Sequence, residues 1–273
     1  MVTIDLDAYS PTEIARKVER LGVAKARTDS LTLVVLAVLA GAFIALGGMF
    51  FVIVVTRSEM GFGITRLIGG LAFSLGLILV VVGGAELFTG NNLIAMAWAS
   101  GQVRTVEVLR NWVWVYIGNA IGALGTVALV GIGGVQDFGG GAVRDTVLAI
   151  GRHKAALGFL DALALGILCN TLVCLAVWLT LAGRTVSDKI LAIVFPISAF
   201  VAIGFEHSIA NMFFLPYAIA LDGFWASSLW IGAVRNLIAV TLGNVIGGTL
   251  LVAGVYWLAY LRGDSQAEKS GPE

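Results

Sequence analysis

The sequence GFEHSIAN, residues 204–211, places two ionisable side chains, Glu206 and His207, in the middle of an apolar segment that runs from 190 to 221. Such a segment is too long for one helix of ~20 residues across a bilayer and too short for two. Polar groups persist at membrane depth only where protein or a water-filled cavity satisfies them. The stretch therefore predicts a membrane helix that is interrupted beside a polar site.

The composition of the whole chain supports a membrane protein. Apolar residues make up 59% of the 273 positions, charged residues 12%, and the mean hydropathy is +0.96. Six apolar segments exceed the ~20 residues of one crossing, at 31–55, 64–99, 106–135, 156–182, 190–221 and 227–261. We expect an all-α protein with six transmembrane helices. The formal net charge of zero argues against nucleic acid as a partner.

An internal repeat relates the two halves of the chain. The motif RN followed by GNAIG, within 110–122, recurs as RN followed by GNVIG, 125 positions later. Glu86 precedes a polar break, TGNN at 89–92, just as Glu206 begins its own break. Each half holds three spans, and an odd number inserts the second copy upside down. The sequence thus predicts an inverted 3+3 repeat whose second and fifth helices are interrupted.

The predicted domains are an amphipathic N-terminal helix (1–28), a six-span channel domain (29–262) and a tail (263–273). The inverted repeats cover about 29–135 and 156–262. The sequence SPTE at 10–13 is typical of a helix start. Lys and Arg number 11 on the side of both termini and 6 on the other, which predicts cytoplasmic termini. The N-terminal helix is then placed to cover the cytoplasmic mouth.

The histidine and the two glutamates allow more than one role. An imidazole in a narrow passage can supply a positive charge or a proton to an anion, and we favour this role for His207 over simple packing because Glu206 lies beside it. Glu86 and Glu206 can hold the broken helices or relay protons, and their symmetric placement favours the structural task. Thr89 can offer its hydroxyl to an anion or belong to an ordinary helix cap.

Other residues near the breaks carry weaker expectations. Asn170 and Asn211 are amides within apolar spans, and they either bond across helices or orient His207. Lys154 would raise the local anion concentration at an outer mouth, or it is an uninvolved loop residue. Four apolar side chains near the breaks form constrictions that exclude hydrated ions, or they pack the bundle: Phe73, Leu77, Leu87 and Phe200.

Three stretches of the chain resemble the formate/nitrite transporter family: AELFTGNN at 85–92, NTLVCLAVW at 170–178 and GFEHSIANMF at 204–213. The resemblance covers nearly the whole chain. It implies an aquaporin-like fold, a homopentamer in which each protomer has its own pore, and passage of formate, nitrite or a similar monovalent anion together with protons.

The resemblance also implies roles by position. His207 corresponds to the central pore histidine, Thr89 to the threonine that faces it, and Lys154 to a vestibule lysine. Asn170 and Glu206 belong to the surroundings of the histidine. The apolar constrictions correspond to Phe73 with Phe200 and Leu77 with Leu87. Family members with these residues differ in substrate, so formate, nitrite and hydrosulfide remain open, as does the choice between a channel and a proton symporter.

Two other functions are alternatives, one from the same transport class and one from another class. A neutral-solute pore for water or glycerol would use the same apolar rings and asparagines. A haem-binding anchor subunit needs paired axial ligands in the spans, and one of the two histidines lies in a span. No catalytic triad, zinc motif or phosphate loop is present. We therefore expect a transport protein of the cell (inner or plasma) membrane, not an enzyme, with no cofactor and no metal.

Overall fold

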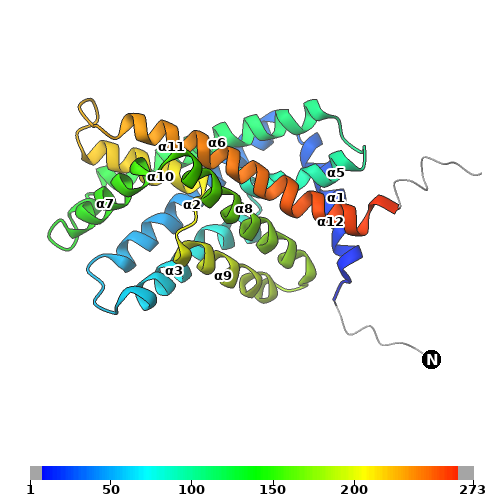
Figure 1. Cartoon of the computed structure of the whole chain (residues 1–273), viewed down its shortest axis with the longest axis horizontal. Helices are drawn as coiled ribbons and strands as arrows, with labels where there is room; N and C mark the ends of the chain where they lie inside the picture. The colour runs from blue at the N-terminus through cyan, green and yellow to red at the C-terminus, as the bar shows by residue number, and fades with distance from the viewer. Residues whose placement is uncertain (1–7, 264–273) are drawn as a thin grey trace, which may run out of the picture.

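The computed structural model describes residues 8–263, so the start of the predicted 1–28 region and nearly all of the predicted tail lie outside the described residues. Within them, six helical stretches are long and apolar enough to cross a membrane. This confirms the expected six-span, all-α membrane protein (Figure 1). The spans are α2 (Ser30–Val55), α3 (Phe62–Gly83), α6 (Thr105–Ile132), α8 (Phe159–Ala182), α9 (Val186–Ile203) and a last one that joins α11 (Trp230–Ile246), the π-helix η3 (Gly247–Gly254) and α12 (Val255–Tyr260).

Shorter helices complete the chain. They are α1 (Pro11–Arg27), α4 (Phe88–Asn91), η1 (Asn92–Ile94), α5 (Ala95–Ala99), η2 (Val135–Asp137), α7 (Ala142–Ala156) and α10 (Ser208–Leu221). Helix α1 begins where the sequence predicts, because Ser10 and Glu13 form a capping box. Helix α7 is not predicted by the sequence analysis, which treats 136–155 as a connection. Helices α1 and α7 lie at opposite ends of the molecule (Figure 1).

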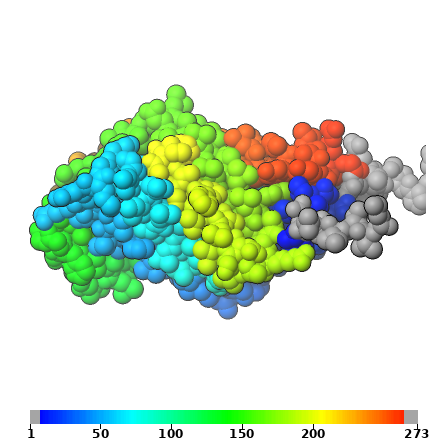
Figure 2. Space-filling view, turned by 90° about the horizontal axis from the view of Figure 1, so that it is seen from below, coloured from blue at the N-terminus to red at the C-terminus, as the bar shows by residue number. Residues whose placement is uncertain are grey.

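The two halves pack alike. Helix α2 lies against α3 and α6, and α8 lies in the same way against α9 and α11. Helices α3 and α9 contact each other across the middle of the molecule and share one face, where they are drawn in light blue and yellow-green (Figure 2). This arrangement is the one expected of an inverted repeat.

The repeated GNxIG motif explains how closely the helices pack. A Cβ atom added to Gly122 on α6 would lie 2.0 Å from the carbonyl oxygen of Val38 on α2. A Cβ atom on Gly247 would lie 2.2 Å from the carbonyl oxygen of Ile167 on α8. Only glycine fits at such contacts, so the motif fixes one close helix pair in each half.

Both predicted interruptions are present. Helix α3 is capped at its C-terminus by Gly84 and helix α9 by Gly204, and both glycines have a left-handed backbone, with φ of +80° and +92°. The next amides, Ala85 N–H and Phe205 N–H, bond back to carbonyls inside α3 and α9, as in a helix-terminating motif. The second and fifth spans are therefore interrupted at 84–87 and 204–207. The first break lies before the predicted 89–92, because those residues are already helical, in α4 and η1.

Candidate functional site

His207 caps the first turn of α10. Its backbone is extended (φ −112°, ψ 116°), and its Nδ1 atom accepts a hydrogen bond of 3.1 Å from the backbone N–H of Ala210. A ring nitrogen that accepts an N–H carries no proton, so the neutral imidazole holds its proton on Nε2. The ring is therefore locked in the tautomer that donates from Nε2.

The Nε2 atom lies 3.0 Å from the hydroxyl oxygen of Thr89. Because Nε2 carries the proton, the histidine donates and the Thr89 hydroxyl oxygen accepts. Thr89 belongs to α4 in the first half, so this bond joins the two interrupted helices across the middle of the molecule. Both residues are buried, His207 with 3% and Thr89 with 0% of its surface exposed.

One asparagine holds the backbone on both sides of each break; we call this arrangement the amide bridge. Asn244 accepts from the N–H of Ser208 (2.9 Å) and donates to the carbonyl of Glu206 (3.0 Å). It also donates to the carbonyl of Gly166 on α8 (2.8 Å). The backbone flanking His207 is thus satisfied without using the histidine side chain.

The first break has the same amide bridge. Asn119 accepts from the N–H of Phe88 (2.9 Å) and donates to the carbonyls of Glu86 (2.9 Å) and Ala37 (2.7 Å). Residue 87 here occupies the place of residue 207. Its backbone is extended in the same way (φ −107°, ψ 126°), but it is a leucine and caps nothing with its side chain.

Glu206 is the centre of a buried ion pair. It accepts from Lys154 Nζ (2.7 Å), from Asn211 (2.6 Å) and from Asn236 (3.3 Å). The side chains of Glu206 and Lys154 are only 4% and 13% exposed. Lys154 therefore lies in the last turn of α7 with its charge paired, and not in a solvated loop.

Glu86 forms the matching network in the first half. It accepts from Lys25 Nζ and from Asn91, both at 2.7 Å. Asn111 accepts from Asn91 and donates to the carbonyl of Lys25 (3.0 Å). The second half repeats this, because Asn236 accepts from Asn211 and donates to the carbonyl of Lys154 (3.0 Å). Two equivalent Lys–Glu–Asn networks therefore support the two breaks, in line with a structural task for both glutamates.

Sequence reasoning missed several residues of these networks: Lys25, Asn111, Asn119, Asn236 and Asn244. A signal was present. The pattern GxxKA occurs at 22–26 in α1 and again at 151–155 in α7. The asparagines belong to the RN and GN motifs of the repeat. The correspondence between the halves thus includes α1 and α7.

The structure places both predicted span amides away from the imidazole. Asn170 donates to the carbonyl of Asn244 (2.6 Å), to the side chain of Asn92 (2.8 Å) and to the carbonyl of Thr89 (3.3 Å). It bonds across helices and fixes the backbone of Thr89, while Asn211 serves Glu206. Their contribution to the histidine is therefore indirect.

Apolar side chains surround the His207–Thr89 contact. Phe73 and Phe200 meet edge to face with ring centroids 5.7 Å apart, and Phe200 stacks on the His207 ring at 5.9 Å. Leu77 and Leu87 join these three in lining a void of only about 10 Å³. The four predicted constriction residues thus lie together around the buried His207.

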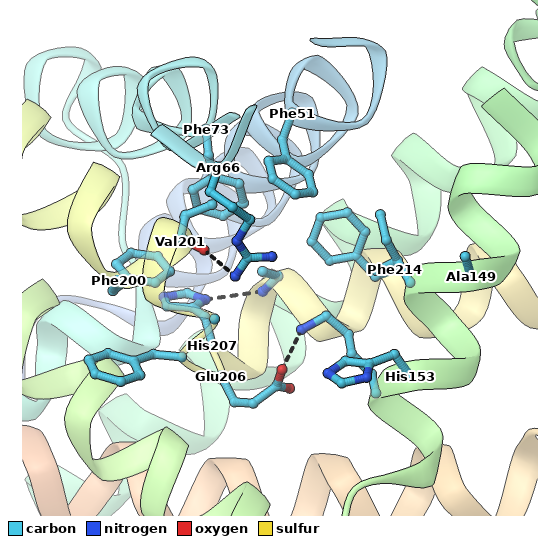
Figure 3. A pocket seen from close by; sticks show the side chains of 15 residues that line it. Phe51, Arg66, Phe73, Ala149, His153, Phe200, Val201, Glu206, His207 and Phe214 are labelled. Carbon is cyan, nitrogen blue, oxygen red and sulfur yellow. Dashed lines mark hydrogen bonds and ion pairs between the residues drawn. The ribbon is translucent and has the colours of Figure 1, made fainter. Parts of the chain in front are cut away.

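A much larger cavity, the vestibule, opens on the α7 side of His207. It has a volume of about 400 Å³ and contains the polar side chains of Arg66, His153, Lys154, Glu206 and His207 among aromatic ones (Figure 3). On the opposite side, α1 leaves a cavity of only about 40 Å³, lined by Gly22, Lys25 and Gly90 among others. The path is thus open to one side and covered by α1 on the other.

A polar contact between two interrupted helices, flanked by apolar rings and reached from a vestibule, defines a membrane channel or transporter. The family model described as formate/nitrite transporter matches residues 12–258. The chain belongs to the formate/nitrite transporter family, as the three resembling stretches indicate.

Relatives and solved structures agree with this assignment. The chain is 42% identical to the formate channel FocA of Escherichia coli (strain K12), over 94% of this chain and 96% of the relative. It is 36% identical to a probable formate transporter of Methanothermobacter thermautotrophicus, over 93% and 97%. A solved pentameric formate channel with formate bound matches with a TM-score of 0.78 and 42% identity, covering 85% of this chain and 98% of that chain. A solved FNT family ion channel matches with a TM-score of 0.81 and 27% identity, covering 91% and 99%.

Proposed function

We propose that this protein conducts small monovalent anions, formate or nitrite, across the cell membrane, and that His207 is the central residue of the pore. The observation that carries the proposal is the Nε2–H of His207, which donates to Thr89 at the closed point between the apolar rings. A small anion that enters this point finds one oriented donor and one hydroxyl. The similarity to proteins named as formate channels supports formate as the first substrate to test.

Passage follows from this geometry. An anion loses its water shell between Phe73 and Phe200, replaces Thr89 as acceptor of the His207 N–H, and passes Leu77 and Leu87. A full positive charge on His207 needs a second proton on Nδ1, and this displaces the N–H of Ala210. Proton supply to the anion through His207 is therefore coupled to loss of the cap of α10, which makes passage dependent on pH.

The orientation and assembly belong to the same proposal. The bias of Lys and Arg places both termini in the cytoplasm, so that α1 covers the cytoplasmic mouth and the vestibule opens outward. Many apolar side chains of the spans face outward, as lipid or neighbouring subunits require. The similarity to a pentameric channel supports a homopentamer in the cell membrane. The function is transport and not catalysis.

Replacing His207 with asparagine tests the central claim. Asparagine keeps an acceptor for the N–H of Ala210, so α10 stays capped, but it has no ring N–H and does not titrate. We expect formate flux into proteoliposomes to fall about 10- to 100-fold, the equivalent of one lost hydrogen bond to a charged group, and its pH dependence to disappear. Unchanged flux across pH 5–8 in a folded variant would overturn the proposal.

Glycerol-driven swelling of the same proteoliposomes separates anion passage from the alternative of a neutral-solute pore. Competition among formate, nitrite and hydrosulfide then ranks the anions. Reversal potentials measured in formate and proton gradients decide between a channel and a proton symporter, because only a symporter couples the two movements at a fixed ratio.

A further inference from the structure

We propose that Arg66 forms a separate anion-binding subsite in the vestibule, which takes a small planar oxyanion such as a carboxylate before it reaches His207. This inference rests on the proposed function and adds a residue that the sequence analysis does not single out. Arg66 lies near the start of α3 and its side chain enters the vestibule (Figure 3).

The first observation is the number of donors that Arg66 has left. Its Nε donates to the carbonyl of Ala202 (2.8 Å) and its Nη2 to the carbonyl of Val201 (3.0 Å). A guanidinium has five N–H donors, so these two hydrogen bonds use two of them and fix the plane of the group. Three N–H groups remain, and the cavity that they line is large enough for an anion.

The second observation is charge. The vestibule lining contains one carboxylate, Glu206, and Lys154 already pairs with it at 2.7 Å. Among residues 8–263 no carboxylate forms an ion pair with Arg66. The lysine and the glutamate cancel, so the net positive charge of the vestibule comes from Arg66.

The third observation is geometry. The bonds from Arg66 to Val201 and Ala202 hold the guanidinium at the end of α9, one residue from Phe200 of the apolar ring. A fixed guanidinium binds two oxygens of a carboxylate side by side, which a lysine does not. An anion held there is at the entrance to the ring and still hydrated on its other side. The subsite therefore raises the local concentration of the anion and leaves the final desolvation to the ring.

A structural role has to be separated from this one, because Arg66 also satisfies two carbonyls at the C-terminus of α9. Arg66→Gln removes the charge and keeps an amide donor, while Arg66→Lys keeps the charge and loses the planar group. Arg57→Gln is the matched control, since Arg57 is exposed at the turn before α3 and does not line the vestibule. All four proteins are compared in proteoliposomes over a range of formate concentrations.

We expect Arg66→Gln to raise the half-saturating formate concentration about three- to tenfold at low ionic strength, with maximal flux and thermal stability within twofold and a few degrees of the parent. This difference in half-saturating concentration should shrink at high salt, because ions screen the charge of Arg66. Arg66→Lys should restore about half of the affinity that Arg66→Gln loses. A structural role predicts salt-independent changes in stability and maximal flux, in both variants. Half-saturation equal to the parent in Arg66→Gln, or a salt-independent change, overturns the inference.

A covalent test covers the case in which Arg66→Gln does not fold. Cys169 and Cys174 are buried, so Arg66→Cys offers one accessible thiol to methanethiosulfonate reagents applied from the vestibule side. A cationic reagent should lower the half-saturating concentration relative to an anionic reagent of similar size, and equal values contradict the subsite. If the parent protein carries no formate at all, the proposed function fails; if the parent carries formate and these variants do not differ, only the subsite fails.

Discussion

The two interrupted helices share their supports and differ in what they present to the pore. Each break has an amide bridge, a glutamate and a lysine from an amphipathic helix. Yet residue 207 is a histidine and its equivalent, residue 87, is a leucine. The two halves thus share the parts that satisfy the backbone at membrane depth, and they differ in the side chain at this one position, which is apolar in the first half and polar in the second.

A second difference lies in the helices that follow. Helix α10 continues for 14 residues after His207, while the equivalent stretch divides into α4, the 3₁₀ turn η1 and α5. Helix α7 leaves a wide vestibule beside the second break, and α1 nearly fills the space beside the first. The two sides of the pore therefore differ in how α1 and α7 pack beside the breaks, although the breaks themselves have equivalent supports.

The largest effect is expected for the amide bridges. Asn244→Leu and Asn119→Leu each remove the partners of one backbone N–H and one carbonyl at a break and of a second carbonyl on the neighbouring α8 or α2, and each group left unpaired costs ~1–3 kcal/mol. Both variants should lose at least about 3 kcal/mol of stability and yield little folded protein, measured by thermal unfolding and size exclusion in detergent. If one of the two variants is as stable as the parent protein, the two amide bridges are not equivalent supports of the breaks.

The carboxylates should show a smaller and unequal effect. Glu206→Gln leaves the nearly buried Lys154 without a counter-charge, at a cost of ~3 kcal/mol. Glu86→Gln should cost only ~1 kcal/mol, because Lys25 is 32% exposed and water screens it. Thermal unfolding of the two variants shows whether Glu206→Gln loses more stability than Glu86→Gln. Addition of Lys154→Met to Glu206→Gln should recover most of the loss, and a double variant as unstable as the single one would contradict the ion-pair account.

Two equivalent glycines sharpen the contrast between α1 and α7. A Cβ on Gly151 would lie 2.1 Å from that of Ala218, whereas a Cβ on Gly22 would lie 3.1 Å from that of Ala97. Gly151→Ala should therefore destabilise the protein by ~1–3 kcal/mol. Gly22→Ala should be nearly neutral, since the better helix propensity of alanine, up to ~1 kcal/mol, offsets the tight contact. Equal melting temperatures for the two variants would mean that α1 is packed as firmly as α7.

The smallest effect concerns pH at the start of α1. Hydrogen bonds from the backbone and hydroxyl of Ser10 lower the pKa of Glu13. A lowered pKa contributes stability above the unfolded value of about 4.3 and loses it as pH falls through the folded one. Hydrogen exchange in the first turn of α1, corrected for intrinsic rates, should hardly change between pH 7 and pH 5 and should rise below pH 4.

Helix α7 provides the control for this pH response, because it begins after Gly141 with no side-chain cap. Its first turn should show no such rise, and neither should α1 in Glu13→Gln. If exchange in α1 of the parent protein rises already at pH 6, another group is responsible. Glu13 would then be excluded as the source of acid sensitivity on the α1 side of the protein.

Sequence reasoning reached the spans and both breaks, because these depend on hydropathy and on a few polar residues in apolar surroundings, whereas the pairing of His207 with Thr89 came from the family resemblance. It did not reach α7, whose 15 residues mix charged and apolar side chains and are too short to span a membrane. It also missed the Lys25–Glu86 pair, since nothing in the local pattern joins residues 61 positions apart. In the sequence, Arg66 is only one of the charges that flank the spans. Its position in the vestibule depends on where α9 ends, and the local pattern around Arg66 does not show this.

The amide bridge has a consequence for how such pores diversify. Residues 87 and 207 have nearly the same backbone angles, and the groups on either side of them are held by Asn119 and Asn244. Apart from the backbone N–H of Ala210, which His207 caps, the side chain at these positions thus contributes little to the fold of the loop that carries it. Substitutions at these two positions can therefore change the chemistry of the pore while the surrounding helices keep their arrangement.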